Sequence, residues 1–286
     1  MAIVFTHLRA FQAVATYRGF SAAARALRVS QPTLTTQVRE LEERYGVELF
    51  LRQGRQIELT EAGRSLLSIS ARLFKLHEEA EELLLNFGEL KTGALKIAAV
   101  SPFHATDMIA RFIERYPSFK VNMLLGNSDR TLKRILELEA DIAILAHTID
   151  DPRIKTITFS TQEIVAFVND DHAWWQRDEI ELAELAGEPL ILREEGSTTR
   201  YALERAAEAA NVALTPFMEI GSREGVWKAV ERGLGIGVVA DFEFVPHPRM
   251  KTLRISGGMI RTEYRLAFLE DRKTVRSIKA FVETVL

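Results

Sequence analysis

A run of polar side chains between residues 31 and 39 has the types and spacing needed to contact nucleic acid. Glutamine, threonine and arginine donate and accept hydrogen bonds that suit base edges and phosphates. The apolar residues Val29, Leu34 and Val38, continued by Leu41, repeat at helical spacing and would seat the same segment on a core. The free face of that helix would present Gln31, Thr33, Thr35, Thr36 and Arg39.

The element that positions these side chains is predicted to be the second helix of a helix-turn-helix. We expect a first, alanine-rich helix capped by Ser21 and a second helix from Gln31 to Tyr45. Small alanine side chains would let the two helices approach closely, and the few residues between them require a steep crossing. An earlier helix, from Thr6 to Tyr17, would support both.

The segment after the second helix predicts a wing. Residues 48–60 read as two short strands around a turn at Gly54, with Arg52 and Arg55 at the rim, where they suit the DNA backbone or minor groove. Up to Thr60 eight arginines face five glutamates, so this part carries a charge of +3 and the remainder of the chain, whose total is -3, carries -6. A basic head on an acidic body fits phosphate binding at one end only.

These residues resemble the N-terminal winged helix of LysR-type transcriptional regulators. The shared phrases are Ser30-Gln31-Pro32, Leu41-Glu42, Gly46-Val47-Glu48-Leu49-Phe50, Arg52 and Leu59-Thr60-Glu61-Ala62-Gly63. The resemblance implies that Ser30 and Pro32 belong to the DNA-contacting set as well. Where the family often has Ser-Arg this chain has Thr35-Thr36, so the base preference that arginine would confer is not carried over. Without the resemblance, a similar helix pair with a polar outer face also fits proteins that never touch DNA.

The composition is that of an ordinary globular protein. A length of 286 residues suits two or three domains, and the apolar share is 47%. The absence of cysteine suits a reducing cytoplasm, and no segment reads as a signal peptide or a membrane span, so we expect a cytoplasmic protein. Six scattered histidines lack metal-ligand spacing, and the glycines at 233–237 follow a helix and enter a strand, the reverse of a dinucleotide fingerprint. We expect no metal, no cofactor and no enzyme activity.

A long helix is predicted from Thr60 to about Leu90, a span without proline. Its apolar residues alternate spacings of three and four, as in the seam of a coiled coil, so we expect a dimer. The alternative is a helix that packs on its own domain. The resemblance implies a linker and dimer helix, and dimers that pair into tetramers through the effector lobes. The predicted seam is Leu66, Ile69, Leu73, Leu76, Ala80, Leu83, Phe87 and Leu90.

The rest of the chain alternates strands and helices, which predicts parallel sheets. The fold class is α + α/β: a winged helix-turn-helix over residues 1–60, a linker helix over 61–90 and an effector domain over 91–286. That domain would have two lobes resembling type 2 periplasmic binding proteins, lobe I with residues 91–160 and 270–286 and lobe II with 161–269, and crossings near Ser160 and Leu269. Expected elements include a helix capped by Ser128, strands 163–168, 236–240 and 263–269, and a C-terminal helix from about Lys273.

Hydroxyls and arginines follow the predicted strands. In open parallel sheets ligands bind beyond the carboxyl ends of the strands, where helix N-termini offer unpaired N–H groups. Converging hydroxyls and guanidinium groups suggest a small anion, a carboxylate or phosphonate, although such residues also cap helices and pair with neighbouring glutamates. The candidate ligand residues are Ser101, Asn127, Ser128, His147, Arg193, Ser197, Thr198, Thr199, Arg200, Ser222, Arg223 and Glu224.

Three sequence motifs resemble one subset of the family more closely: residues 192–200 (LREEGSTTR), residues 222–224 (SRE) and residues 126–128 (GNS). They look like those of a LysR-type subset associated with 2-aminoethylphosphonate catabolism. The function implied is a ligand-responsive, DNA-binding transcriptional regulator that senses a small anionic metabolite between two lobes, with double-stranded operator DNA and a second copy of the chain as partners and RNA polymerase as a candidate partner. The alternative is a cytoplasmic solute-binding or sensor protein that acts through protein partners.

Overall fold

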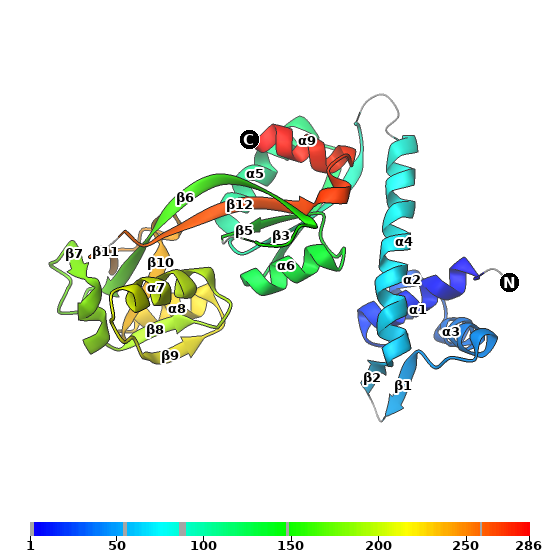
Figure 1. Ribbon diagram of the computed structural model, residues 1–286, viewed down its shortest axis with the longest axis horizontal. Helices are drawn as coiled ribbons and strands as arrows, with labels where there is room; N and C mark the ends of the chain where they lie inside the picture. Colours follow the sequence, from blue (N-terminus) through cyan, green and yellow to red (C-terminus); the bar gives the residue numbers. More distant parts are fainter. Residues whose placement is uncertain (1–2, 54–55, 86–89, 147–148, 258) are drawn as a thin grey trace. The chain divides into compact units, whose positions relative to one another are not determined.

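The chain forms two compact units, residues 1–87 and 88–286 (Figure 1). The computed structural model describes residues 3–53, 56–85, 90–146, 149–257 and 259–286, with only the backbone described for residues 52, 53 and 56. Within these ranges, no helix is both long enough and apolar enough to cross a membrane.

The first unit is a winged helix-turn-helix that runs into a long helix. A single apolar core holds its helices together, with Phe11, Leu34, Val38 and Phe50 among its buried members. Two of its helices end on an arginine in the left-handed region, Arg28 being at φ 56°, so the chain turns sharply between them. The elements are α1 (Phe5–Tyr17), α2 (Phe20–Leu27), α3 (Gln31–Tyr45), β1 (Phe50–Gln53), β2 (Gln56–Leu59) and α4 (Glu61–Leu85).

Two details of the predicted helix-turn-helix are wrong. Ser21 does not cap α2, because the helix begins one residue earlier, at Phe20, whose ring contacts Phe50, and Gly19 holds the cap position without a side-chain bond. Val29 does not seat α3 on the core, because it lies in the turn before the helix and 39% of it is exposed. Ala23 and Ala24 are buried in the core that α2 shares with α3, as the predicted close approach of the two helices requires.

The second unit is built on one continuous sheet with the strand order β4-β3-β5-β12-β6-β10-β8-β9, and β11 pairs with β6 and β7. Its first part comprises β3 (Gly93–Ala99), α5 (Pro102–Arg115), β4 (Phe119–Leu125), α6 (Ser128–Leu136) and β5 (Ile142–Leu145). The middle comprises β6 (Ile154–Asn169), β7 (Glu179–Glu181), η1 (Leu182–Gly187), β8 (Leu190–Arg193), α7 (Thr198–Ala209), β9 (Pro216–Ile220) and α8 (Arg223–Glu231). The last part comprises β10 (Ile236–Ala240), η2 (Asp241–Glu243), β11 (Met250–Ser256), β12 (Arg261–Leu269), η3 (Glu270–Arg272) and α9 (Arg276–Val285).

Both ends of this sheet are covered on two faces, which makes two α/β lobes. In lobe I, α5 and α9 cover the face of the sheet that carries Ile97, whereas α6 covers the opposite face and packs Ile135 against it. In lobe II the strand β6 alternates, with Ile164 and Ala166 toward α7 and Val165 toward α8. Buried strands with helices on both faces are the expected result of the alternating strand and helix pattern.

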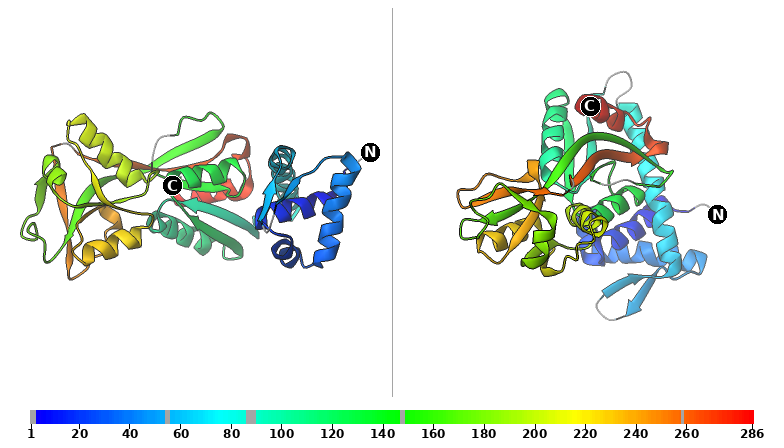
Figure 2. Two further views of the ribbon diagram at one scale, coloured as in Figure 1. Left: turned by 90° about the horizontal axis from the view of Figure 1, so that it is seen from below. Right: turned by 60° about the vertical axis from the view of Figure 1, so that its left-hand side comes forward.

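Two long strands, β6 and β12, connect the lobes, and Figure 2 shows them from two sides. They pair antiparallel from Arg261 opposite Glu163 to Leu269 opposite Ile154. The predicted crossing near Ser160 therefore falls within β6. The predicted return at Leu269 is wrong, because Leu266 and Phe268 already belong to the core of lobe I. The chain crosses back near the start of β12.

Several element boundaries also differ from the prediction. The cap of α6 is Asn127, whose side chain accepts a hydrogen bond from the N–H of Arg130, so Ser128 is the first helical residue. The C-terminal helix begins at Arg276 and not at Lys273 as predicted, because a 3-10 turn (Glu270–Arg272) precedes it. The described part of the linker helix ends at Leu85, and Leu90 packs on the core of lobe I.

Candidate functional site

The start of α3 is fixed by local signals. Ser30 has extended backbone angles, and its hydroxyl accepts a hydrogen bond from the N–H of Thr33 at 3.2 Å. Pro32 stands in the first turn, where a missing N–H costs nothing. With Leu34 and Val38 buried, the opposite face of α3 lies open to solvent and comprises Gln31, Thr33, Thr35, Thr36 and Arg39.

Four of the polar side chains on this face, Gln31, Thr33, Thr35 and Arg39, already have intramolecular partners. Ser21 donates to Oε1 of Gln31 at 2.7 Å, and the hydroxyl of Thr35 donates to the backbone carbonyl of Gln31 at 2.9 Å. Arg39 forms an ion pair with Glu43 one turn later at 2.5 Å, and the hydrogen bond that its guanidinium donates to this carboxylate raises the pKa of Arg39. Thr35 is therefore partly committed to its own helix.

The wing is an antiparallel pair, β1 with β2, as predicted from residues 48–60. Its register places Arg52 opposite Ile57. The side chain of Arg52 and all of Arg55 lie outside the described residues, so their predicted phosphate contacts stay predictions.

Several contacts fasten α3, the wing and α4 to one another. The carboxylate of Glu42 accepts from the N–H of Leu49 at 2.8 Å, and Thr60 donates its hydroxyl to the carbonyl of Glu48 at 2.8 Å. Gly63 lies against the Leu49 carbonyl so closely that a Cβ atom would stand 2.2 Å from that oxygen. The glycine of the Leu-Thr-x-x-Gly phrase therefore allows α4 to pack directly on the chain that leaves α3.

The predicted seam of α4 is apolar and open to solvent over most of its length. Leu66 packs on the core of the first unit, whereas Ile69 is 63% exposed, Leu76 65% and Leu83 54%. Leu73 and Ala80 are also exposed, and Phe87 lies outside the described residues. A row of exposed leucines on one helix is unfavourable in water unless another surface covers it.

Residues at the helix N-termini bring the two lobes of the second unit into contact. The hydroxyls of Ser128, in lobe I, and Thr198, in lobe II, are 2.5 Å apart, and the N–H of Ser128 donates to the carbonyl of Gly196 at 3.3 Å. Asn127 also donates its side-chain amide to the carbonyl of Glu195 at 3.4 Å. These predicted ligand residues bind one another across the lobes in this structure.

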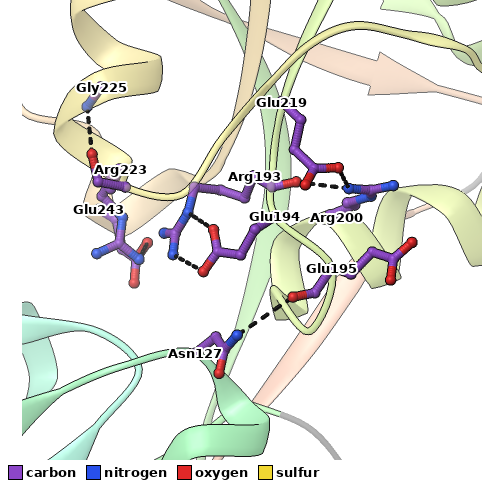
Figure 3. A network of polar contacts seen from close by, with 10 residues as sticks. Asn127, Arg193, Glu194, Glu195, Arg200, Glu219, Arg223, Gly225 and Glu243 are labelled. Carbon is purple, nitrogen blue, oxygen red and sulfur yellow. Dashed lines mark hydrogen bonds and ion pairs between the residues drawn. The ribbon is translucent and has the colours of Figure 1, made fainter. Parts of the chain in front are cut away.

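Each arginine of the predicted anion site faces a carboxylate. Figure 3 shows Arg193 on Glu194, Arg200 on Glu219 and Arg223 beside Glu243. Arg193 binds both oxygens of Glu194, at 2.7 and 2.9 Å. Burial raises the pKa of Glu194, but the hydrogen bonds to its carboxylate and the positive charges of Arg193 and Arg130 together outweigh it and leave the pKa below its usual value. A simple anion at these three arginines would have to displace a carboxylate already in place.

Arg200 is the most heavily bonded of the three. It donates to Glu204 at 2.7 Å, to Glu219 at 2.5 Å and to the carbonyl of Arg193 at 3.0 Å. Burial lowers its pKa, whereas the two carboxylates raise it, and the net effect is a rise.

Glu243 is a buried carboxylate where lobe II meets the crossing strands. Nη2 of Arg223 lies 2.7 Å from Oε2, an ionic contact without hydrogen-bond alignment, and the hydroxyl of Tyr264 donates to Oε1 at 3.1 Å. Burial, followed by the charge of Glu243, raises the pKa of Tyr264 well above its usual value. The ring of Tyr264 also contacts His104 of lobe I, which stacks on Phe242 with centroids 4.0 Å apart. This cluster joins both lobes to β12.

Seven of the predicted ligand residues divide between two cavities. Ser128, Ser197, Thr198 and Arg200 line a cavity of about 1140 Å³ between the N-terminal half of α7, the start of α6 and the crossing strands. Arg193, Thr199 and Arg223 instead line a cavity of about 10 Å³ beside Phe167 and Trp227, which has no room for a metabolite.

The other predicted ligand residues that the structure describes, Ser101, Asn127, Ser222 and Glu224, line neither cavity. Ser101 is buried and caps α5, Ser222 caps α8 by accepting from the N–H of Gly225, and Glu224 is exposed on α8. His147 lies outside the described residues. The predicted cluster does not meet at one point, because Ser101 and Ser222 cap separate helices and the side chain of Glu224 is exposed.

The large cavity also has lining residues that the sequence reasoning missed. Tyr201 and Arg205 lie on α7, where the guanidinium of Arg205 is 5.9 Å from the centre of the Tyr201 ring. Arg261 is the first residue of β12, and Met259 lies two residues before it. Asp129 and Glu195 add carboxylates at the lobe contact. No sequence motif marks Tyr201, Arg205, Met259 or Arg261, because the two on α7 meet the other two only when β12 returns beside α7.

Comparisons with known proteins cover both units. Residues 5–64 match the model of the bacterial regulatory helix-turn-helix protein of the lysR family, and residues 88–286 match the LysR substrate binding domain. The RuBisCO operon transcriptional regulator of Allochromatium vinosum is 30% identical over 292 residues, which span 100% of this chain and 96% of that protein. The transcriptional activator CmpR of Synechocystis is 30% identical over 232 residues, which span 80% of this chain and 76% of that protein.

Solved structures share the fold. Full-length OxyR of Pseudomonas aeruginosa, in a variant form, superposes with a TM-score of 0.77 at 20% identity and covers 100% of this chain and 95% of its own. Full-length CbnR in complex with its target DNA superposes with a TM-score of 0.74 at 22% identity and covers 99% of both chains.

Proposed function

Since the chain belongs to the LysR family of DNA-binding transcriptional regulators, we propose that it reads its operator with the exposed face of α3. The observation that carries this proposal is the division of α3 into two faces. Leu34, Val38 and Leu41 are buried, and a row of hydrogen-bonding side chains that begins at the helix N-terminus is exposed. Such a helix presents donors and acceptors to base edges when its N-terminal turns enter the major groove.

The test is a selection of binding sites from random duplex DNA, followed by gel shifts on the selected site and on DNA upstream of the gene. Gln31→Ala should weaken binding by about 1–3 kcal/mol at particular base pairs. Arg39→Ala, if Arg39 exchanges Glu43 for phosphate, should weaken all sequences alike and make binding less dependent on salt. If the wild-type protein enriches no sequence, the proposed DNA interface is wrong. The alternative function, a sensor that acts through protein partners, is then the better explanation of the chain.

We also propose that α4 pairs with α4 of a second copy. The exposed Ile69, Leu76 and Leu83 give the apolar stripe such a pair requires. The two winged helix-turn-helix units of such a dimer would bind two half-sites. Once the first unit is bound, the second is held at a high effective concentration near its half-site, which strengthens binding.

For the effector we propose a small molecule that carries both charges, such as an amino-phosphonate, in the 1140 Å³ cavity. Carboxylates already balance Arg200, whereas Asp129, Glu195 and Arg205, which also line the cavity, offer both charges to a ligand. A ligand in contact with both lobes would shift their arrangement by its differential affinity for the two states.

Calorimetry can test the two charges separately. 2-Aminoethylphosphonate should bind, whereas ethylphosphonate, which lacks the ammonium, and ethylamine, which lacks the phosphonate, should not. Arg205→Ala should weaken binding, and Ser101→Ala, which lies outside the cavity, should not. Loss of binding in Ser101→Ala with retention in Arg205→Ala would place the effector at the N-terminus of α5 instead.

A further inference from the structure

Ser21 lies in the first turn of α2 but does not perform the usual task of a serine there. The N-terminus of the helix is capped at Gly19 without any side-chain bond. The hydroxyl of Ser21 instead donates to Oε1 of Gln31, 2.7 Å away on α3. This bond joins the two helices of the helix-turn-helix through side chains that are both exposed to solvent.

In this structure the bond holds Oε1 of Gln31, and not Nε2, on the hydroxyl of Ser21. The terminal torsion of glutamine is broad and nearly two-fold, so a free side chain presents its oxygen and its NH₂ about equally to a neighbour. Holding Oε1 on Ser21 turns Nε2 away from α2. Gln31 is the first residue of α3, the position from which a recognition helix reaches base edges.

The neighbouring hydroxyls do not compete for this task. Thr33 shares a hydrogen bond of 2.7 Å with the cap residue Ser30, and Thr35 donates to the backbone carbonyl of Gln31. Both contacts stabilise the helix itself. Among the side chains of the first turn of α3, the NH₂ group of Gln31 is therefore the donor that the contact with Ser21 leaves facing outward.

We propose that Ser21 is a positioning residue for base readout: it fixes Gln31 so that Nε2 donates to an acceptor in the major groove. Such acceptors are N7 and O6 of guanine, N7 of adenine and O4 of thymine. The proposal rests on the DNA interface proposed above and adds a residue of α2 to its specificity.

The experiment measures base preferences by selection and sequencing from random duplex DNA for full-length wild type and variants. Gln31→Ala should reduce the preference at one base pair in each half-site by about 5- to 150-fold, the equivalent of about 1–3 kcal/mol. Ser21→Ala should reduce the preference at that same base pair by a smaller factor, and Ser21→Thr, which keeps the hydroxyl, should retain it. Thr16→Ala, which removes an exposed hydroxyl from α1, is the matched control and should change nothing.

Two further variants test the mechanism. If Ser21 acts only through Gln31, the double variant Ser21→Ala/Gln31→Ala should lose no more preference than Gln31→Ala alone. Gln31→Glu can still accept from Ser21 but offers no donor, so its preference should move toward cytosine, whose N4 amine is a donor. Affinity for random DNA and its dependence on salt should be the same for Ser21→Ala and wild type.

Other outcomes would overturn the inference. An unchanged preference in Ser21→Ala would show that Gln31 orients itself. Additive losses in the double variant, or equal weakening on all sequences, would show that Ser21 contacts DNA directly. Failure of the wild-type protein to enrich any sequence would instead contradict the DNA interface itself, so the two failures are distinguishable.

Discussion

Replacement of Arg223 by alanine should destabilise the second unit by removing the counter-charge of a buried carboxylate. The side chain of Glu243 is fully buried, and Nη2 of Arg223 stands 2.7 Å from it. After Arg223→Ala the carboxylate keeps only the hydrogen bond from Tyr264, at 3.1 Å. A charge left buried with a single neutral donor is costly, because neither water nor a cation solvates it.

The magnitude follows from the burial of the two partners. Removing one member of a buried ion pair costs about 3–5 kcal/mol. Since 20% of the Arg223 side chain is exposed, water can enter the space it leaves, so we expect the lower end of that range. For a unit of this size, about 3 kcal/mol lowers the melting temperature by about 6–12 °C.

Tryptophan fluorescence in a urea titration measures this loss selectively. The three tryptophans of the chain, Trp174, Trp175 and Trp227, all belong to residues 88–286, so their signal follows the second unit alone. The midpoint of Arg223→Ala should fall while the slope stays that of wild type, because the surface exposed on unfolding is unchanged.

Two controls separate charge from packing. In Arg223→Ala/Glu243→Gln the buried group is neutral and can still accept from Tyr264, so most of the lost stability should return. Arg153→Ala, which breaks a pair with Asp151 at the surface, should shift the midpoint much less. The reasoning is refuted if the double variant is as unstable as Arg223→Ala, or if the surface variant loses as much.

Three further changes test other parts of the molecule. Leu76→Glu places charge on the apolar stripe of α4, so sedimentation should show dissociated protein; an unaltered oligomer would mean that another surface holds it. Gly63→Ala puts a Cβ atom against the Leu49 carbonyl, so a thermal melt followed by circular dichroism should show a loss of about 1–3 kcal/mol, and an unchanged melt would contradict the close contact. Burial lowers the pKa of His104, which the charge of Asp107 only partly offsets, so the unfolded chain binds the proton more readily and stability should fall as the pH drops below about 6.5. His104→Phe should flatten that fall between about pH 7 and 5.5 in urea titrations, although His172, whose pKa burial also lowers, keeps part of the slope; an equally steep fall would exclude His104 as its source.

Elements with local signals were predictable from the sequence. The bounds of α3, Gln31–Tyr45, and of β10, Ile236–Ala240, agree with the prediction to the residue. A serine cap, a proline in the first turn and a glycine at φ 64° after the last turn define α3 without reference to the rest of the chain. The resemblance to the LysR family rests on the same local phrases, and the comparisons confirm it.

Features that depend on distant partners were not predictable. The strand β7 has three residues and pairs with β11, which in turn pairs with β6. The first half of β6 is half-exposed, so these segments give no clear hydrophobic pattern. The anion site fails for the same reason. Arginines and hydroxyls are visible in the sequence, but Glu219 and Glu243, which neutralise Arg200 and Arg223, come from other elements.

The contacts around Leu49 give the DNA-binding head a mechanical property. The contacts of Glu42, Thr60 and Gly63 hold α3 and the first turn of α4 to the same short stretch of chain, residues 48–49. The DNA-binding head is therefore joined rigidly to α4. The 25 residues of α4 make a lever of about 37 Å. Tilting such a lever by about 5° moves its end by about 3 Å, close to the ~3.4 Å between successive base pairs. A change of a few degrees in how two such helices pair would therefore shift the two recognition helices by one step along the DNA.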